Sequence, residues 1–350
     1  GEEECWQWES KGADGYTRFE SAMIGHGTRI ILHIKNNTQD ENYDDYLFDY
    51  KLRMLVKKYS DYIRYPIQME VEKSRKKEGE ENKYESYMEI ETLNSMIPLW
   101  KKSKSEIEDE QYERFYKDKF MATEEPLRTI HYSVEGLSSF NAMLFIPKRP
   151  PFNYFSADYE KGLSLYSSGV LIMDRCADLI PDHYGFVRGI VDSQDLTLNI
   201  SRETLQHDRQ VRTIAKNIEK KIKNELMTML NTSREEYEKF FMDFGLAMKF
   251  GLYNSFGQLK DELAEMILFY SSTEKKLVTL DEYISRMKED QKYIYYVTGK
   301  SHEIIERLPQ IENLIDKGYE VLYCTDEVDD FMIRIMRDYK DKEFKSAAGG

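Results

Sequence analysis

The sequence lacks the features that would indicate a membrane protein, a disulfide-stabilised protein or one of the common hydrolases. No apolar run approaches the roughly 20 residues that span a bilayer, and no signal-peptide pattern opens the chain. The three cysteines are odd in number and widely spaced, which predicts free thiols in a reducing, cytoplasmic compartment. The six histidines are scattered, and neither G-x-S-x-G nor H-E-x-x-H occurs. We therefore expect no metal site and no hydrolase active site of these kinds.

Positive charge is in deficit as well. Lys and Arg number 50 against 64 Asp and Glu, and the net charge of -14 repels a phosphate backbone, so nucleic acid is not an expected partner. A hydrophobic fraction of 41% with 33% charged residues is typical of a globular chain with long solvated helices. The length of 350 residues predicts two or three folding units.

Hydrophobic periodicity predicts a mixed α/β protein. Strands are expected over 5–9, 28–34, 67–71, 129–134, 140–146, 162–173, 293–297 and 319–323. Helices are expected over 43–63, 107–120, 202–229, 235–249, 258–270, 280–288 and 328–337, with another beginning near Ser301. Strands that alternate with helices after residue 290 predict parallel pairing there.

The segment from Glu72 to Glu85 mixes both charge signs and has almost nothing to bury, so it is predicted to be a linker between domains. The chain begins with Gly1 rather than Met, and its last residues, 347–350, show no structural pattern. We therefore expect it to be part of a longer protein.

A polar segment from Asp192 to Gln206 leads into a predicted helix. The free N–H groups of a helix start, together with Arg202, would form a positive tip suited to an anion. The alternative is that Asn199 or Ser201 only caps the helix while Arg202 is solvated. Both interpretations remain open from the residues alone.

Other local patterns also have two interpretations. Thr298-Gly299-Lys300-Ser301 resembles the end of a phosphate-binding loop, but Ile294 stands where that motif needs glycine, so Ser301 is predicted to be a helix N-cap. Trp100 would be either a half-exposed contact residue or a core residue. The same alternatives apply to Phe152, Tyr154 and Phe155.

Ordered motifs along nearly the whole chain resemble the ninety-kilodalton heat-shock protein family of chaperones, in its bacterial branch. They are WESKG at 8–12, HGT at 26–28, KYSDYI at 58–63, PLW at 98–100, FIPKRPPF at 145–152, VDS at 191–193, LNISRE at 198–203 and YYVTG at 295–299. The resemblance implies an ATP-dependent, stress-related protein-folding chaperone that binds unfolded client proteins.

The resemblance also implies a domain order. Residues 1–73 would be the C-terminal remnant of an N-terminal ATPase domain of the gyrase, histidine-kinase and MutL (GHKL) type, and 74–86 a charged linker. A middle domain would follow, with two α/β sandwich units like the second domain of ribosomal protein S5. Its large α/β part would span 87–231, a helical connector 232–290 and a small α/β part 291–342, before a tail at 343–350.

Site residues follow by the same resemblance. Arg202 would reach the γ-phosphate of ATP, with Asn199 and Gln206 in the same catalytic loop. Gly27 and Thr28 would lie on the adenine side of the nucleotide. Client or domain contacts are expected at Trp100, Phe152 and Phe155.

The family's magnesium-binding asparagine and catalytic glutamate have no counterpart in this sequence. We therefore expect ATP and Mg²⁺ to act in the full-length protein, and the 350-residue chain neither to bind ATP tightly nor to hydrolyse it. Expected partners are client proteins and the protein's own ATPase domain, with no membrane. The full-length family protein is a homodimer, whereas this chain is expected to be monomeric. The alternative function is a passive interaction scaffold without a catalytic role.

Overall fold

The computed structural model describes residues 4–12, 15–23, 25–76, 84–136, 138–194, 196 and 209–348. The chain divides into two compact units, Gly1–Met54 and Leu55–Gly350. The sequence placed this boundary after residue 73 instead. The side chain of Asn94 explains the difference, because its hydrogen bonds to the main chain at Ile63, Tyr65 and Ile67 tie the segment before residue 73 to the second unit.

The first unit contains an exposed antiparallel hairpin, formed by β1 (Cys5–Glu9) and β2 (Thr17–Ser21). The strand predicted over 28–34 is wrong, because these residues are exposed and belong to no ladder among the described strands. The predicted helix from residue 43 is present as a 3-10 turn, Tyr43–Leu47, followed by α1 (Asp49–Leu55). A π-helical turn, Val56–Ser60, continues it into the second unit.

The predicted linker is largely a two-stranded ribbon in its described part. β3 (Gln68–Lys76) pairs in antiparallel register with β4 (Tyr84–Thr92). One pair of the charges that suggested a linker lies across the ribbon, with Arg75 Nε 2.6 Å from Glu85 Oε1. Opposite charges on facing strands support pairing, and this explains why a sequence with little to bury still forms strands.

A mixed sheet forms the centre of the large α/β part, in the order β5-β6-β9-β7-β8. β7 and β9 are parallel, and the remaining neighbours are antiparallel. The hairpin predicted around Gly136 is confirmed as β5 and β6. The strand bounds are Pro126–Val134 (β5), Phe140–Pro147 (β6), Leu163–Ser167 (β7), Val170–Cys176 (β8) and Arg188–Ser193 (β9).

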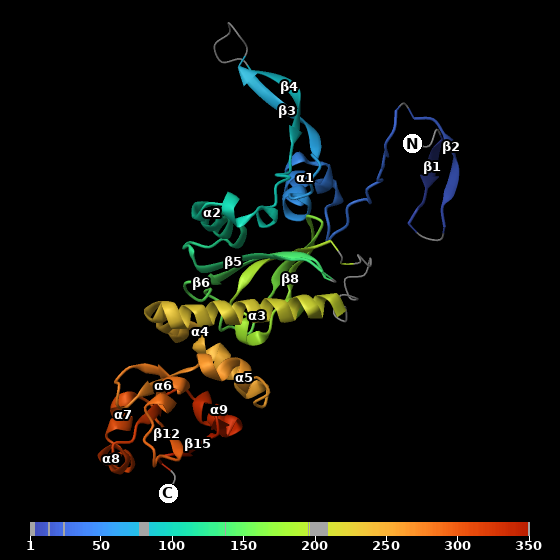
Figure 1. Ribbon diagram of the computed structural model, residues 1–350. Helices are drawn as coiled ribbons and strands as arrows, with labels where there is room; N and C mark the ends of the chain where they lie inside the picture. Colours follow the sequence, from blue (N-terminus) through green and yellow to red (C-terminus); the bar gives the residue numbers. More distant parts are fainter. Residues whose placement is uncertain are drawn as a thin grey trace. The chain divides into compact units, whose positions relative to one another are not determined.

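Helices cover both faces of this sheet (Figure 1). α3 (Arg209–Thr232) places the predicted stripe of Val211, Ile214, Ile218, Ile222 and Leu226 against one face. α2 (Asp109–Phe120) covers the other with Tyr112 and Tyr116. A sheet that is buried on both sides needs the nearly continuous apolar sequence that β6 has.

The helix predicted over 235–249 is present as α4 (Arg234–Asn254). The helix predicted over 258–270 is wrong in its second half. A short α5 (Lys260–Leu263) and a 3-10 turn, Ala264–Met266, lead into strand β10 (Leu268–Ser271). The run Ile267-Leu268-Phe269 is buried in a sheet, and a short apolar run of this kind does not reveal its type by periodicity.

The small α/β part has a sheet in the order β11-β10-β13-β12-β15-β14, with β12 parallel to both β13 and β15, as predicted for this part. The predicted tail is corrected, because β15 (Lys342–Ser346) is an inner strand. Ser301 caps α7 (His302–Glu306) through its side chain, as predicted. The other bounds are Leu277–Thr279 (β11), Leu280–Ser285 (α6), Tyr293–Thr298 (β12), Pro309–Asp316 (α8), Val321–Cys324 (β13), Val328–Met336 (α9) and Asp338–Tyr339 (β14).

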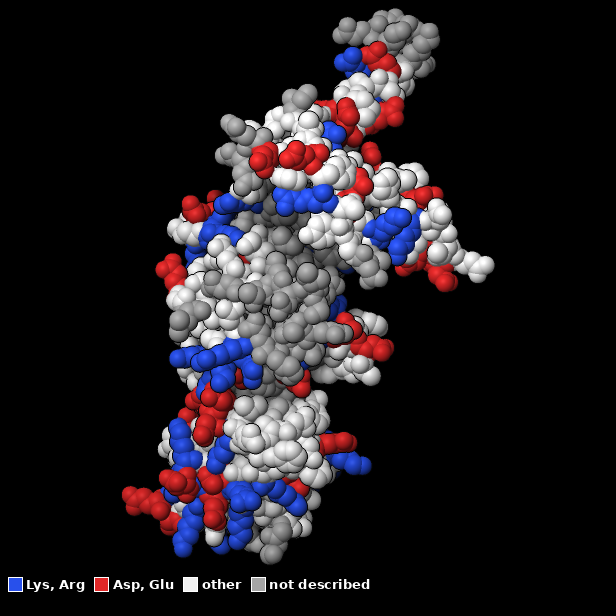
Figure 2. Space-filling model, turned by 90° about the vertical axis from the view of Figure 1, so that its right-hand side faces the viewer, with Lys and Arg blue, Asp and Glu red and all other residues white. Residues whose placement is uncertain are grey.

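The surface of the described residues carries mixed charge. On the face shown in Figure 2, Lys and Arg side chains lie beside Asp and Glu side chains rather than in one continuous basic patch. A stripe of one positive sign is what a nucleic-acid backbone requires. None of the described helices has the length and apolar character that crossing a bilayer requires.

Candidate functional site

The three residues predicted to be catalytic, Asn199, Arg202 and Gln206, lie outside the described residues. The elements on either side are described: β9 ends at Ser193, and α3 begins at Arg209. Val191 of β9 and Val211 of α3 belong to the same buried core. Both ends of the predicted catalytic segment are therefore fixed to the large α/β part.

Asp192 secures the β9 end of this segment. Asp192 is 1% exposed, and one carboxylate oxygen, Oδ2, accepts a hydrogen bond from Trp100 Nε1 and forms an ion pair with Lys101 Nζ, both at 2.9 Å. A buried carboxylate needs such donors, because an unpaired buried charge is costly. The contact joins residues that are far apart in sequence and holds β9 to the turn Leu99–Lys101.

Trp100 is 0% exposed, so the structure has the core arrangement rather than the half-exposed contact residue. Its ring packs edge-on against Tyr62 and tilted against Tyr166, with centroids 4.5 and 5.1 Å away. The hydrogen bond to Asp192 satisfies the indole N–H, which is what permits a tryptophan to be buried completely. In this conformation the side chain offers no surface to a client protein.

A buried histidine extends the same cluster. His131 Nδ1 lies 2.7 Å from the Tyr112 hydroxyl, and Nε2 lies 3.0 Å from the Trp100 carbonyl oxygen. Burial lowers the pKa of the His131 imidazole below its ordinary value, against the opposing effect of the hydrogen bond to Trp100. The cluster is therefore built around a neutral histidine, and we call it the Trp100 cluster (Trp100, Tyr62, Tyr112, His131 and Tyr166).

The aromatic residues after the prolines have the opposite environment. Phe152 is fully exposed, and Phe155 is 66% exposed. Pro147 ends β6, and prolines at 150 and 151 cannot donate to a ladder, so the chain leaves the sheet before these residues. Tyr154 folds back toward the core and contacts Phe244 of α4, with ring centroids 5.7 Å apart.

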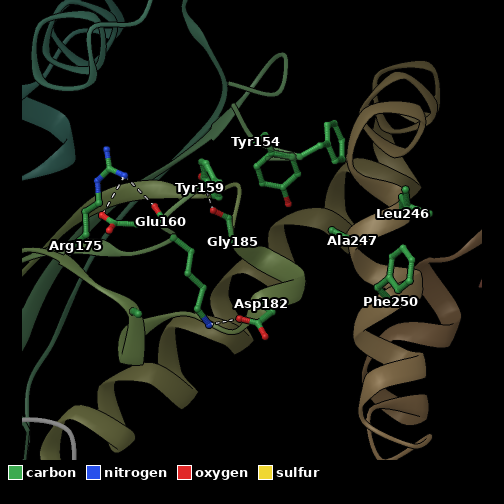
Figure 3. Close-up of a pocket in the computed structure, with 12 residues that line it drawn as sticks. Tyr154, Tyr159, Glu160, Arg175, Asp182, Gly185, Leu246, Ala247 and Phe250 are labelled. Atoms are coloured by element: carbon green, nitrogen blue, oxygen red, sulfur yellow. Dashed lines mark hydrogen bonds and ion pairs between the residues drawn. The ribbon is translucent and has the colours of Figure 1, made fainter. Parts of the chain in front are cut away.

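A cavity of about 720 Å³ lies beside this loop, and we call it the α4 cavity. Figure 3 shows Tyr154 and Tyr159 on one side of it and Leu246, Ala247 and Phe250 of α4 on the other. Its volume is within the range of about 300–1,000 Å³ typical of ligand pockets. The remaining lining residues are Phe155, Glu160, Lys161, Arg175, Ala177, Asp182 and Gly185.

Two close approaches of the backbone position the walls of the cavity. Gly162 has φ +148°, and a Cβ there would lie 2.7 Å from the backbone of Arg175, so glycine lets the segment before β7, which carries Lys161, approach β8, which carries Arg175. Gly251 lets α4 approach the turn Asp182–Tyr184, since a Cβ there would lie 2.5 Å from Cβ of His183. The cavity therefore depends on packing between segments that are distant in sequence.

Two ion pairs lie in the cavity wall. Lys161 Nζ is 2.5 Å from Asp182 Oδ1 and also donates to the Ile180 carbonyl oxygen at 2.9 Å. Arg175 is 3.8 Å from a carboxylate oxygen of Glu160 and donates to the Glu160 carbonyl oxygen at 3.2 Å. The wall thus combines aromatic surface with charges of both signs.

Gly27 and Thr28, predicted to lie beside the adenine of ATP, belong to the first unit. Both are exposed, and a Cβ added at Gly27 would meet no atom within 4 Å. The described surroundings of these two residues therefore leave open space rather than a close cradle for a nucleotide.

Comparison with known proteins gives the family. The sequence profile described as Hsp90 protein matches residues 80–350, well over half of the chain. The chain belongs to the Hsp90 family. Proteins named Chaperone protein HtpG from Clostridium perfringens and Bacillus subtilis are each 56% identical to it over 350 residues. These alignments cover 100% of this chain and 56% of each relative, so the chain spans a little over half of their length.

Phe155, which the sequence predicts to be a contact residue, lines a cavity that no pattern in the sequence predicted. Leu246 and Phe250 are four residues apart on α4, so they share one exposed face of a helix whose other face is buried. Apolar residues on the solvent side of an amphipathic helix were the available signal. Lys161 and Arg175 carried no such signal, because they meet only where the segment before β7 passes close to β8.

Proposed function

We propose that this chain acts as the middle region of an ATP-dependent chaperone, together with the end of its ATPase domain. Arg202 presents its guanidinium to the γ-phosphate of ATP bound in the rest of that domain, with Asn199 and Gln206 shaping the loop. A cation at this position offsets the charge that builds up on the transferred phosphoryl group. Phe152 and Phe155 provide the contact surface for the ATPase domain or for client proteins.

The observation that carries the proposal is 56% identity over the entire chain with relatives named as chaperones. The structure adds physical support at the predicted catalytic segment. β9 and α3, the elements on either side of this segment, pack in the same buried core. Phe152 is available for contact because it is fully exposed.

Gly27 and Thr28, the two residues assigned to the adenine side of the nucleotide, are exposed in this chain. The proposal therefore assigns ATP and Mg²⁺ to the ATPase domain of the full-length protein. Client proteins, homodimer formation and action in the cytoplasm belong to the same proposal for the full-length protein.

Replacement of Arg202 by alanine in the full-length protein tests the catalytic part. We expect ATP turnover to fall by about 10²-fold or more while nucleotide affinity stays similar, because the guanidinium acts on the developing charge rather than on binding. Lys300→Ala is the matched control and should leave turnover unchanged. Unchanged turnover in Arg202→Ala would remove this residue from the mechanism.

The scaffold alternative predicts a different result. If the chain only holds partners together, adding it to the separately produced ATPase domain leaves ATP turnover unchanged. The proposed function predicts stimulation, which Arg202→Ala abolishes.

A further inference from the structure

A buried lysine joins α4 to the small α/β part, and the proposed ATPase chemistry makes no use of it. Lys249 of α4 is 5% exposed, and its Nζ lies 2.8 Å from Asp326 Oδ2 and 2.7 Å from Asp329 Oδ1. We propose that these three residues form an ionic latch, which fixes the orientation of the small α/β part on α4. The latch does not depend on the proposed function.

The two acids of the latch lie at the start of α9 and hold each other in place. Asp329 is 1% exposed, and its second carboxylate oxygen, Oδ2, accepts a hydrogen bond from the Asp326 backbone N–H at 3.0 Å. The Asp329 backbone N–H donates in return to the Asp326 carbonyl oxygen, also at 3.0 Å. The Asp329 carboxylate therefore has a fixed position relative to α9, so its contact with Lys249 is directional.

The ammonium group of Lys249 lies where several elements meet. α9 packs on α4, and Lys249 Nζ is 5.7 Å from the ring centroid of Phe241 on α4 and 5.8 Å from that of Phe269 on β10. Burial lowers the pKa of Lys249, but the two carboxylates outweigh this effect and keep the pKa above its ordinary value. Lys249 therefore carries its positive charge inside the core.

The apolar side of the same junction is rich in methionine. Met248 of α4 and Met332 and Met336 of α9 are buried in one core. Apolar burial is non-directional and methionine side chains adapt to their neighbours, so these contacts stabilise the junction without selecting one angle. The charges add that selection, because a rotated α9 would leave Lys249 and Asp329 buried without each other, which is costly.

Distances between two spin labels test this inference on the whole 350-residue chain. The labels are attached to a ketone-bearing amino acid in place of Lys220 on α3 and Glu312 on α8, so the three cysteines stay unaltered. Both positions are exposed, and they lie on the two sides of the junction. We expect pulsed electron paramagnetic resonance to give one narrow distance distribution when the latch is intact.

Two variants separate orientation from stability. Lys249→Met leaves the buried Asp329 unpaired, so the urea midpoint should fall and the distance distribution should broaden. Lys249→Met/Asp329→Asn removes both buried charges and keeps an acceptor for the Asp326 N–H. Its urea midpoint should recover because no buried charge is left unpaired, whereas its distribution should stay about twofold broader than that of the intact latch.

Lys239→Met is the matched control, because Lys239 is an exposed lysine on the same helix. It should change neither the urea midpoint nor the distance distribution.

Four results would overturn the proposal: a broad distribution with the latch intact, a distribution in Lys249→Met/Asp329→Asn as narrow as that of the intact latch, equal broadening in Lys239→Met, or an unchanged urea midpoint in Lys249→Met. The measurements use no ATP and leave Arg202 unaltered. The ionic latch and the proposed function can therefore fail separately.

Discussion

The Trp100 cluster and the α4 cavity are two aromatic regions of this protein, and residue patterns alone left the same pair of interpretations open for both. In the first, Trp100 is completely buried and its neighbours close around it. In the second, Phe152 is fully exposed and Phe155 lines an open cavity. A neighbouring proline therefore does not decide whether an aromatic residue of this protein is buried or exposed.

Polar partners and backbone constraints account for the difference. Trp100 has a polar edge, and Asp192 on β9 supplies the acceptor that lets it enter the core. The prolines at 150 and 151 direct the other segment away from β6 before Phe152 is reached. A phenylalanine in such a loop gains a buried environment only where another element covers it, and α4 covers Tyr154 but leaves Phe152 exposed.

Of the substitutions predicted here, Trp100→Ala should lower the free energy of unfolding most. A smaller loss than in the others would contradict the contrast between the two regions. Removal of a fully buried tryptophan leaves a cavity and takes away one of the two side-chain partners of Asp192, and we expect a loss of about 3–5 kcal/mol in the free energy of unfolding. Urea denaturation monitored by circular dichroism measures it. A loss as small as that of Phe155→Ala would show that the two regions are packed alike.

A smaller, pH-dependent effect is expected at His131. Its pKa is lowered in the folded chain, so its contribution to stability is complete above the ordinary pKa of 6.5 and is lost as the pH falls from there through the folded value. Urea midpoints at about pH 7.5 and about pH 5.5 should therefore differ less in His131→Gln than in the unaltered chain. An identical pH dependence in both would mean that the Trp100 cluster does not sense protonation.

Phe152→Ser should have the smallest effect on stability, within about 0.5 kcal/mol, because a fully exposed side chain contributes little to folding. The same denaturation series measures it. A loss of several kcal/mol would show that Phe152 is covered in solution, and the contrast with Trp100 would disappear.

Local pattern predicted most of the regular elements. The stripe on α3, the end of β5 and the bounds of β6, β12 and α9 agree with the expectations, because periodic segments carry a strong signal. The extended segment 28–34, the helix over 258–270, the linker and the tail were wrong. In each of these cases the outcome depended on whether another segment supplied a pairing partner.

The candidate site was less accessible to sequence reasoning. Motifs carried the resemblance to the family, and with it the predicted roles of Arg202, Asn199 and Gln206, which stay predictions. The α4 cavity was not foreseen, because it forms where the loop after β6, the edge of β8 and the face of α4 come together. No local pattern in any one of these three segments describes their contact.

The sequence by itself determined the order of the elements, the Hsp90 family and the absence of disulfides among the three cysteines, since each depends on residue types and spacing along the chain. Only the tertiary structure decided that Trp100 is buried while Phe152 is not, that a charged segment forms a ribbon, and that Lys161 and Arg175 share a wall. These outcomes depend on partners supplied by distant segments, and burial, pairing and charge complementarity exist only once those partners meet.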